Sequence, residues 1–401
     1  MGLDRRWAVT RAAGGGLAAG TGDEGRAPRG WSGREGRALA WGWRGDRVGI
    51  IQRMPNFPIA VLPGDGIGPD VVAEGLKILR AVEAKLTGVT FSTKEFSVGA
   101  GEFLRSGDPL PPDTFAQIAE HSTILLGAMG IPNVRWPDGR EMAPQIDIRE
   151  KLDLYCGLRP IVLYHPDDTP IKGKTVIDFA LVRESTEGLF VSRLKPYSLA
   201  ADEVTDQLRI TRTGAERVIR SAFRIAALRR KKVTLVDKAN VLPTMAYFRS
   251  IFDQVAGEFP DIATERVYVD ACALYLVQRP ESFDVMVTEN MFGDILSDLA
   301  AALVGGMGMA PSADIGDEHA VFQPSHGSAP DIAGKGIANP VATILSVALM
   351  LDWLDHPETR RGGDMIRAAV SQVFADRTAR TSDMGGTLST TEMGDRVAAA
   401  L

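Results

Sequence analysis

Two aspartates, Asp294 and Asp298, stand four residues apart in the segment VTENMFGDILSDLA (287–300). Residues spaced i and i+4 share one face of a helix, so the two carboxylates would lie together. Their neighbours are apolar, namely Phe292, Ile295, Leu296 and Leu299. Because carboxylates among core residues are costly without a cation, the pair points to Mg²⁺ or Mn²⁺, which oxygen ligands bind. Asp270 in YVDA is a possible third ligand, and a solvated acidic face is the alternative for the pair.

Three arginines have the chemistry to bind an acidic substrate. Arg149 and Arg159 stand ten residues apart in REKLDLYCGLRP, and Arg183 follows in VRESTEG. A guanidinium group can hold a carboxylate through two parallel hydrogen bonds. Three of them together would suit a di- or tricarboxylate, whereas each one alone is compatible with a surface ion pair.

Lys238 follows the apolar run of LVDKANVL. A lysine at the end of a strand in apolar surroundings can have a lowered pKa and act as a general base. An ordinary ion-paired lysine is the alternative.

Two glycine-rich segments could bind a nucleotide. PSHGSAPDIAGKGIANP (324–340) has few bulky side chains, so its main-chain N–H groups could approach a phosphate or a base. Within it, His326 could touch an adenine or a phosphate, or be structural, and Asp331 could accept from a ribose 2′-hydroxyl while repelling a 2′-phosphate. LPGDGIGPDV (62–71) lacks the G-x-G-x-x-G spacing and is equally compatible with a structural turn.

Alternating apolar runs and amphipathic stretches must position these residues. Short apolar runs predict strands, and stretches with apolar residues at helical spacing predict helices between them. This alternation indicates an α/β fold with a largely parallel sheet. The polar segment from Arg193 to Arg212 is expected to be an arm or excursion. The predicted strands are 59–62, 122–129, 174–185, 231–240 and 283–290, and the predicted helices after residue 200 are 212–230, 243–257 and 292–304.

The composition is that of a globular protein rather than a membrane or nucleic-acid-binding one. The chain has 401 residues, 45% hydrophobic and 24% charged, with a net charge of −6 and two cysteines. No apolar run is long enough to span a membrane, and an acidic total disfavours nucleic acid. Two cysteines exclude a disulfide scaffold and a cysteine-based zinc module.

The first 53 residues differ from the rest. They hold ten Arg, thirteen Gly and four of the six Trp, but no Lys. Their five acidic residues argue against a mitochondrial transit peptide. They also lack the apolar stretch that a secretory signal needs. We expect a disordered or non-native extension over 1–53, a working domain from Met54, and a cytoplasmic enzyme.

Seven motifs occur in one order over about 340 residues, and together they resemble the β-decarboxylating dehydrogenases, the family of 3-isopropylmalate and isocitrate dehydrogenases. The last motif is similar to the isopropylmalate branch almost residue for residue. The motifs are GDGIG, LRP, RESTEG, VDKANVL, YVDA, FGDILSDLA and HGSAPDIAGKGIANP.

The resemblance implies a role for each candidate residue. Arg149, Arg159 and Arg183 correspond to the clamp on the substrate carboxylates, and Lys238 to the base that removes the 2-hydroxyl proton. Asp270, Asp294 and Asp298 correspond to the Mg²⁺ or Mn²⁺ ligands. Lys238 and Asp270 would reach the site of a partner subunit, which implies a homodimer. The adenosine loop would use His326, Gly327, Ala329, Asp331, Ile332 and Asn339. The pair Asp331-Ile332 resembles the NAD form, because NADP-dependent relatives have Lys and Tyr there.

Two positions depart from the family pattern. The family has a Tyr, as the final acid or part of its relay, where this chain has Phe190, and a phenyl ring has no proton to give. The isopropylmalate branch has a Leu-rich turn where this chain has Gln145, with Asp147 nearby. A polar amide is unfavourable beside an isopropyl group, so Gln145 could instead bind a hydroxyl or carboxylate of the substrate. The place of Glu141 near the nicotinamide is left open.

These features predict a two-domain α/β enzyme with the isopropylmalate/isocitrate dehydrogenase-like fold, which is not a true Rossmann fold. Residues 54–154 and 305–401 would form the nucleotide-binding domain, and 155–304 the metal, substrate and dimerisation domain. The expected reaction is NAD- and metal-dependent oxidative decarboxylation of a 2-hydroxy diacid, 3-isopropylmalate or a close analogue. Tartrate, D-malate, homoisocitrate or isocitrate as substrate, or a non-catalytic regulatory homologue, are the alternatives.

Overall fold

The structure, a computed structural model, describes residues 55–401. The extension predicted for 1–53, and the start at Met54, lie outside the described residues. Ten strands form one sheet in the order β2-β1-β3-β10-β9-β4-β5-β8-β6-β7. The strands are β1 (Asn56–Gly64), β2 (Thr90–Glu95), β3 (Thr123–Ala128), β4 (Cys156–Val162), β5 (Asp178–Glu184), β6 (Lys232–Asp237), β7 (Ala263–Tyr268), β8 (Val285–Thr288), β9 (Pro311–Ile315) and β10 (Ala320–Pro324).

The strand direction reverses at the centre of the sheet. The pairings within β2-β1-β3-β10 and within β5-β8-β6-β7 are parallel. The three central pairings, β10–β9, β9–β4 and β4–β5, are antiparallel. A connection as short as residues 316–319 between β9 and β10 allows only an antiparallel pair. The predicted α/β fold is confirmed, and this centre distinguishes it from an all-parallel Rossmann sheet.

Eleven α-helices lie among the described residues. The three helices predicted after residue 200 are present as α5, α6 and α8. The helices are α1 (Gly68–Glu83), α2 (Ala100–Ser106), α3 (Pro112–Ala119), α4 (Pro144–Lys151), α5 (Arg212–Ala227), α6 (Pro243–Ala256), α7 (Val269–Gln278), α8 (Asn290–Ala302), α9 (Val341–Trp353), α10 (Pro357–Ala375) and α11 (Thr390–Ala400).

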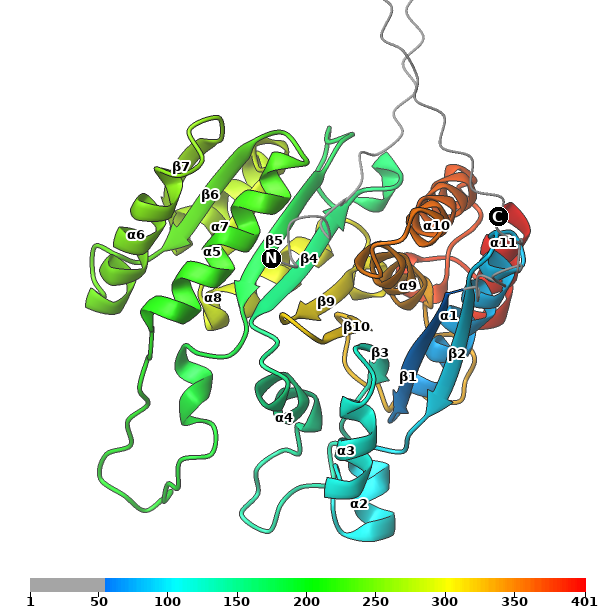
Figure 1. Cartoon of the computed structure of the whole chain (residues 1–401), viewed down its shortest axis with the longest axis horizontal. Helices are drawn as coiled ribbons and strands as arrows, with labels where there is room; N and C mark the ends of the chain where they lie inside the picture. The colour runs from blue at the N-terminus through cyan, green and yellow to red at the C-terminus, as the bar shows by residue number, and fades with distance from the viewer. Residues whose placement is uncertain (1–54) are drawn as a thin grey trace, which may run out of the picture.

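Helices cover both faces of the sheet. In β5, Ala180 and Val182 pack in a core that includes α5 and α6, whereas Phe179 and Leu181 pack in a second core with α7 and α8. In Figure 1, α5 lies in front of these strands and α8 behind them. Because successive side chains of a strand point to opposite faces, strands buried on both sides are apolar throughout. This explains why short continuous apolar runs in the sequence predict these strands.

The two halves of the sheet come from different parts of the chain. Strands β1, β2, β3, β9 and β10 come from 55–154 and 305–401, and β4 to β8 come from 155–304. The domain boundaries at these positions stay a prediction. Residues 193–211 contain no helix or strand and form the expected arm, the green loop at the lower left of Figure 1. No helix in the described range is long and apolar enough to cross a membrane.

Candidate active site

A cavity of about 260 Å³ opens between the two halves of the sheet and collects most of the predicted site residues. Its walls come from the end of β3, α4, β4, β5, α8, β10 and the loop that follows β10. The residues from the sequence prediction that line it are Gln145, Arg149, Arg159, Arg183, Phe190, Asp294, Asp298, His326 and Gly327.

The three arginines are buried and converge on this cavity. Arg149 comes from α4, Arg159 from β4 and Arg183 from β5. In the β4–β5 pair, Arg159 lies opposite Leu181 and Gly157 lies opposite Arg183. Residues opposite one another, and residues two apart, share a face of the sheet, so Arg159 and Arg183 point the same way. Burial, followed by the neighbouring Arg149, lowers the pKa of Arg183 to about 10, which leaves it protonated at neutral pH.

Asp314 on β9 is the buried partner of this cluster, and no sequence motif had identified it. Its carboxylate accepts from Arg149 Nη2 at 3.1 Å, Arg159 Nη2 at 3.4 Å and Gln323 Nε2 at 2.7 Å. Burial would raise the pKa of Asp314, but the charges of the three arginines outweigh burial and hold that pKa below its ordinary value. Asp314 is therefore ionised and pairs with two of the three cations.

The acidic pair lies at the edge of the cavity rather than in the core. Asp294 forms an ion pair with Arg183, and its side chain is 49% exposed. Ile295, expected among core residues, is 58% exposed, so the expectation of an apolar environment on all sides is wrong. The helix is amphipathic, and only its Leu296 face packs inward. Burial and then the charge of Asp294 raise the pKa of Asp298.

Two carboxylates on one helix face fit a divalent cation, which oxygen ligands bind. Within residues 55–401 no group of three or more potential ligands gathers to hold a metal. In this one chain, Asp270 therefore does not complete the site of Asp294 and Asp298.

Lys238 and Asp270 lie together, away from the cavity. Lys238 follows β6, Asp270 is in the first turn of α7, and Lys238 Nζ donates to Asp270 Oδ1 at 2.8 Å. This hydrogen bond is the main reason why the pKa of Asp270 is lowered. In a single chain, Lys238 is thus an ion-paired lysine. It does not line the cavity that holds the three arginines.

The loop after β10 places His326 and Gly327 on the cavity wall. His326 Nδ1 lies 2.9 Å from the Gly327 carbonyl oxygen, and burial lowers the pKa of His326, which keeps the ring neutral. Asp331 is exposed on the same loop. The Asn339 side chain is occupied internally, because it donates to Asp383 at 3.2 Å and accepts from Val341 N at 3.1 Å.

Two further residues of this loop, Ala329 and Ile332, pack with Ile67, Val71 and Ala338 in a small apolar cluster. The loop therefore rests on the start of α1.

The GDGIG segment is structural in this chain. The Asp65 carboxylate accepts from the backbone N–H groups of Ala100, Gly101 and Gly130, each at 2.8 Å. Gly66 has φ +60°, and a Cβ there would lie 2.0 Å from the Ser328 carbonyl oxygen. The segment thus joins the start of α2 to the loop that carries His326, which its spacing alone did not reveal.

The two positions that depart from the family pattern both line the cavity. The Phe190 ring centre lies 5.3 Å from the Arg183 guanidinium carbon. Gln145 Oε1 is buried and accepts no hydrogen bond from any described residue. Asp147, by contrast, pairs with Arg193 of the arm at 2.6 Å and does not line the cavity.

Comparison with known proteins identifies the family of this chain. The family described as isocitrate/isopropylmalate dehydrogenase matches residues 58–397. The 3-isopropylmalate dehydrogenase of Moorella thermoacetica is 44% identical over 355 residues, which cover 85% of this chain and 98% of that protein. The Aquifex aeolicus 3-isopropylmalate dehydrogenase is 42% identical over 333 residues, 80% of this chain and 90% of that protein.

Among solved structures, the isocitrate dehydrogenase from Methylococcus capsulatus has a TM-score of 0.76 and 36% identity, with 86% of this chain and 99% of that chain covered.

Proposed function

Since the chain belongs to the isocitrate/isopropylmalate dehydrogenase family and is an oxidative decarboxylating dehydrogenase, we propose that it acts on a malate-type 2-hydroxy diacid with NAD and Mg²⁺ or Mn²⁺. The substrate would be 3-isopropylmalate or a close analogue. The observation that carries this proposal is the convergence of three buried arginines and an acidic pair on one cavity.

The residues of the cavity and those of a second subunit would divide the chemistry between them. Arg149, Arg159 and Arg183 would bind and orient the two carboxylates, and Lys238 of a second subunit would take the proton of the 2-hydroxyl group. A bound NAD would supply the hydride acceptor for the oxidation at C2. Asp294 and Asp298, with Asp270 of a second subunit, would hold the cation. A divalent cation supplies Lewis acidity, which stabilises negative charge on the keto oxygen while CO₂ leaves.

Two features support a homodimer with shared sites. Lys238 and Asp270 lie apart from the cavity, so a second copy would have to supply them. Large apolar side chains are exposed on two neighbouring helices, α7 and α8, where solvent alone would be an unfavourable environment. These side chains are Leu274, Val277, Met291 and Ile295.

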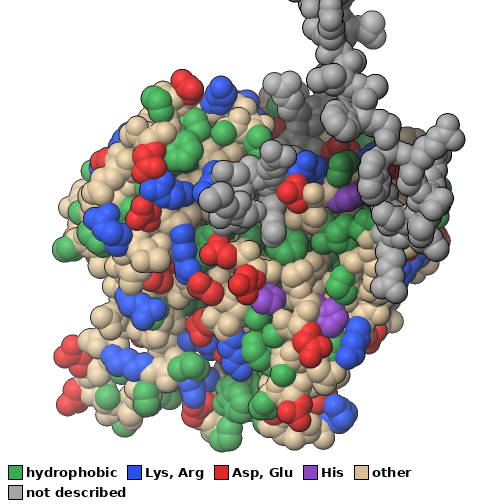
Figure 2. Space-filling model, in the orientation of Figure 1, with side chains coloured by type: hydrophobic (Ala, Val, Ile, Leu, Met, Phe, Trp, Pro, Cys, Tyr) green, Lys and Arg blue, Asp and Glu red, His purple; other side chains and the backbone are tan. Residues whose placement is uncertain are grey.

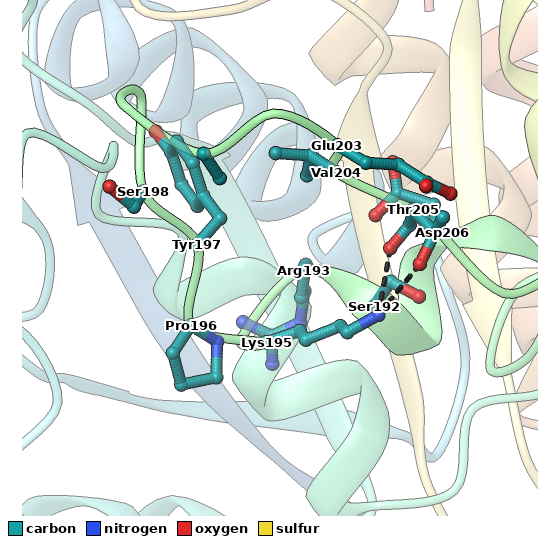
Figure 3. A pocket seen from close by; sticks show the side chains of 11 residues that line it. Ser192, Arg193, Lys195, Pro196, Tyr197, Ser198, Glu203, Val204, Thr205 and Asp206 are labelled. Atoms are coloured by element: carbon teal, nitrogen blue, oxygen red, sulfur yellow. Dashed lines mark hydrogen bonds between the residues drawn. The ribbon is translucent and has the colours of Figure 1, made fainter.

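The arm offers further apolar surface to a second copy. Ser192 and residues of the arm up to Asp206 line a hollow of about 500 Å³, shown in Figure 3. There Lys195 Nζ donates to the Thr205 carbonyl oxygen at 2.8 Å. Tyr197 and Val204 are more than half exposed there, and Leu199 is 95% exposed. We place the dimer contact on 155–304 and the nucleotide site on 54–154 with 305–401.

NAD rather than NADP is proposed because Asp331 is exposed on the loop that carries His326, where its charge would repel a 2′-phosphate.

A cytoplasmic location is part of the same proposal, since both cysteines, Cys156 and Cys272, are free and buried, which suits a reducing compartment. Acidic and basic side chains are interspersed on the face in Figure 2, so that face offers no uniform basic surface to nucleic acid.

The test is NADH formation with Mn²⁺ and a panel of 2-hydroxy diacids. The panel contains 3-isopropylmalate, D-malate, tartrate, isocitrate and homoisocitrate, and each is repeated with NADP. We expect turnover of at least one diacid with NAD and less with NADP. The second candidate substrates are diacids whose 3-substituent can form a hydrogen bond. The buried Gln145 Oε1, which has no partner among the described residues, favours them. If no diacid yields NADH, the proposed function is wrong.

A further inference from the structure

Asp314 lies behind the arginine cluster and holds two of its members together. The register of the central strands places Arg183, Gly157 and Asp314 in one row across β5, β4 and β9. Gly157 has no side chain between them, and a Cβ there would lie 3.2 Å from Asp314 Oδ1. Asp314 itself is 2% exposed and is not among the described residues that line the cavity. It therefore acts on a ligand through the residues that donate hydrogen bonds to it, Arg149, Arg159 and Gln323.

The charge of Asp314 changes what the cavity can bind. Three guanidinium groups alone would favour an anion with three negative charges. The buried, ionised Asp314 removes one unit and leaves the cluster at about +2, the charge that two carboxylates match. The proposed cation and Lys238 balance the acidic residues 270, 294 and 298, so these do not alter the comparison.

We propose that Asp314 is a positioning residue that sets the charge of the arginine cluster, so that the cavity selects anions with two carboxylates over anions with three. This deepens the proposed function and rests on it, because the arginines are taken as the substrate-binding groups. A third carboxylate would meet a site with no unpaired cation, and its desolvation would go uncompensated.

The neighbour of Asp314 provides a charge-preserving control. Gln323 on β10 donates to Asp314 Oδ2 at 2.7 Å, is 9% exposed and lines the cavity. In the double variant D314N/Q323E the amide and the carboxylate exchange places within one hydrogen-bonded pair. The volume and the net charge of the cluster are nearly kept, while the single variant D314N raises its charge by one unit.

The experiment measures binding of succinate and of tricarballylate to the full-length protein by calorimetry at neutral pH, with Mn²⁺ present throughout. We expect the parent to prefer succinate. Asp314→Asn should shift the ratio of the two dissociation constants about tenfold toward tricarballylate, about 1.4 kcal/mol, and D314N/Q323E should restore the parent ratio. Asp352→Asn, which alters another buried aspartate paired with an arginine, should leave the ratio unchanged.

Three results would overturn the proposal: no binding of either anion to the parent, an unchanged ratio in D314N, or a double variant that keeps the D314N ratio. If D314N does not fold, Gln323→Glu alone must weaken the binding of tricarballylate more than the binding of succinate. The opposite order would also overturn the proposal. Because binding needs no turnover, an enzyme inactive on all diacids would refute the proposed function without changing these measurements.

Discussion

Lys238 Nζ lies 2.8 Å from Asp270 Oδ1, yet neither residue lines the cavity that holds the other candidate groups. A base and a metal ligand that lie together but outside the site have a role only if another subunit brings a cavity to them. This relationship leads to the most direct test of the dimer.

Mixing two inactive variants should restore activity if sites are shared. Lys238→Met removes the base and Asp298→Asn removes a metal ligand, so each homodimer should lose at least about 10²-fold in kcat. After the two proteins are unfolded and refolded together in equal amounts, half of the dimers carry one intact site, and the mixture should regain about one quarter of the parent rate.

The control mixes Lys238→Met with Asp270→Asn, which affect the same half of the site and should give no recovery. Recovery in neither mixture, with dimers present by light scattering, would contradict shared sites.

Phe190→Tyr should place a hydroxyl where the cavity wall now has only a ring. Phe190 lines the cavity and lies over Arg183, so the new group would have room to donate a proton after CO₂ leaves. We expect kcat to rise severalfold and CO₂ release to match NADH formation more closely, with KM little changed. Unchanged rate and unchanged ratio of CO₂ to NADH would show that the absent hydroxyl does not limit this enzyme.

Gln145→Leu should change the preference for the 3-substituent. The buried Oε1 of Gln145 has no donor among the described residues, and a leucine would replace this polar atom with apolar surface. We expect kcat/KM for 3-isopropylmalate to rise about tenfold relative to tartrate, from a change of about 1–2 kcal/mol. Gln145→Asn, which keeps the amide, should leave the preference near that of the parent, and a larger effect of Asn than of Leu would rule out polarity as the cause.

Gly66→Ala should destabilise the fold far more than Gly88→Ala. Both glycines have positive φ, +60° and +70°, so both substitutions carry the same backbone cost of about 1–2 kcal/mol. Only at Gly66 would the new Cβ also collide with a backbone oxygen, that of Ser328, whereas nothing lies within 4 Å at Gly88. Chemical denaturation should give a loss above about 3 kcal/mol for Gly66→Ala. Equal losses for the two variants would refute the close approach.

Local patterns were sufficient to predict the layers and much of the chemistry. The helical period places Asp294 and Asp298 on one face of α8, and continuous apolar runs identify strands buried on both sides. The motifs that resemble the family pointed to the three arginines, and the structure places all three at the cavity. These predictions depend on residues close in sequence, where geometry follows directly from the backbone.

Other features depend on strand register between distant segments, which no local pattern contains. Only tertiary structure places Asp314 of β9 across Gly157 from Arg183 of β5, because an antiparallel centre joins strands more than a hundred residues apart. Tertiary structure also makes GDGIG a link between distant segments, because the Asp65 carboxylate accepts hydrogen bonds from the backbone N–H groups of Ala100, Gly101 and Gly130. The sequence by itself thus determined which groups are available for chemistry, and the packing of the sheet decided which of them meet, because long-range pairing sets their distances.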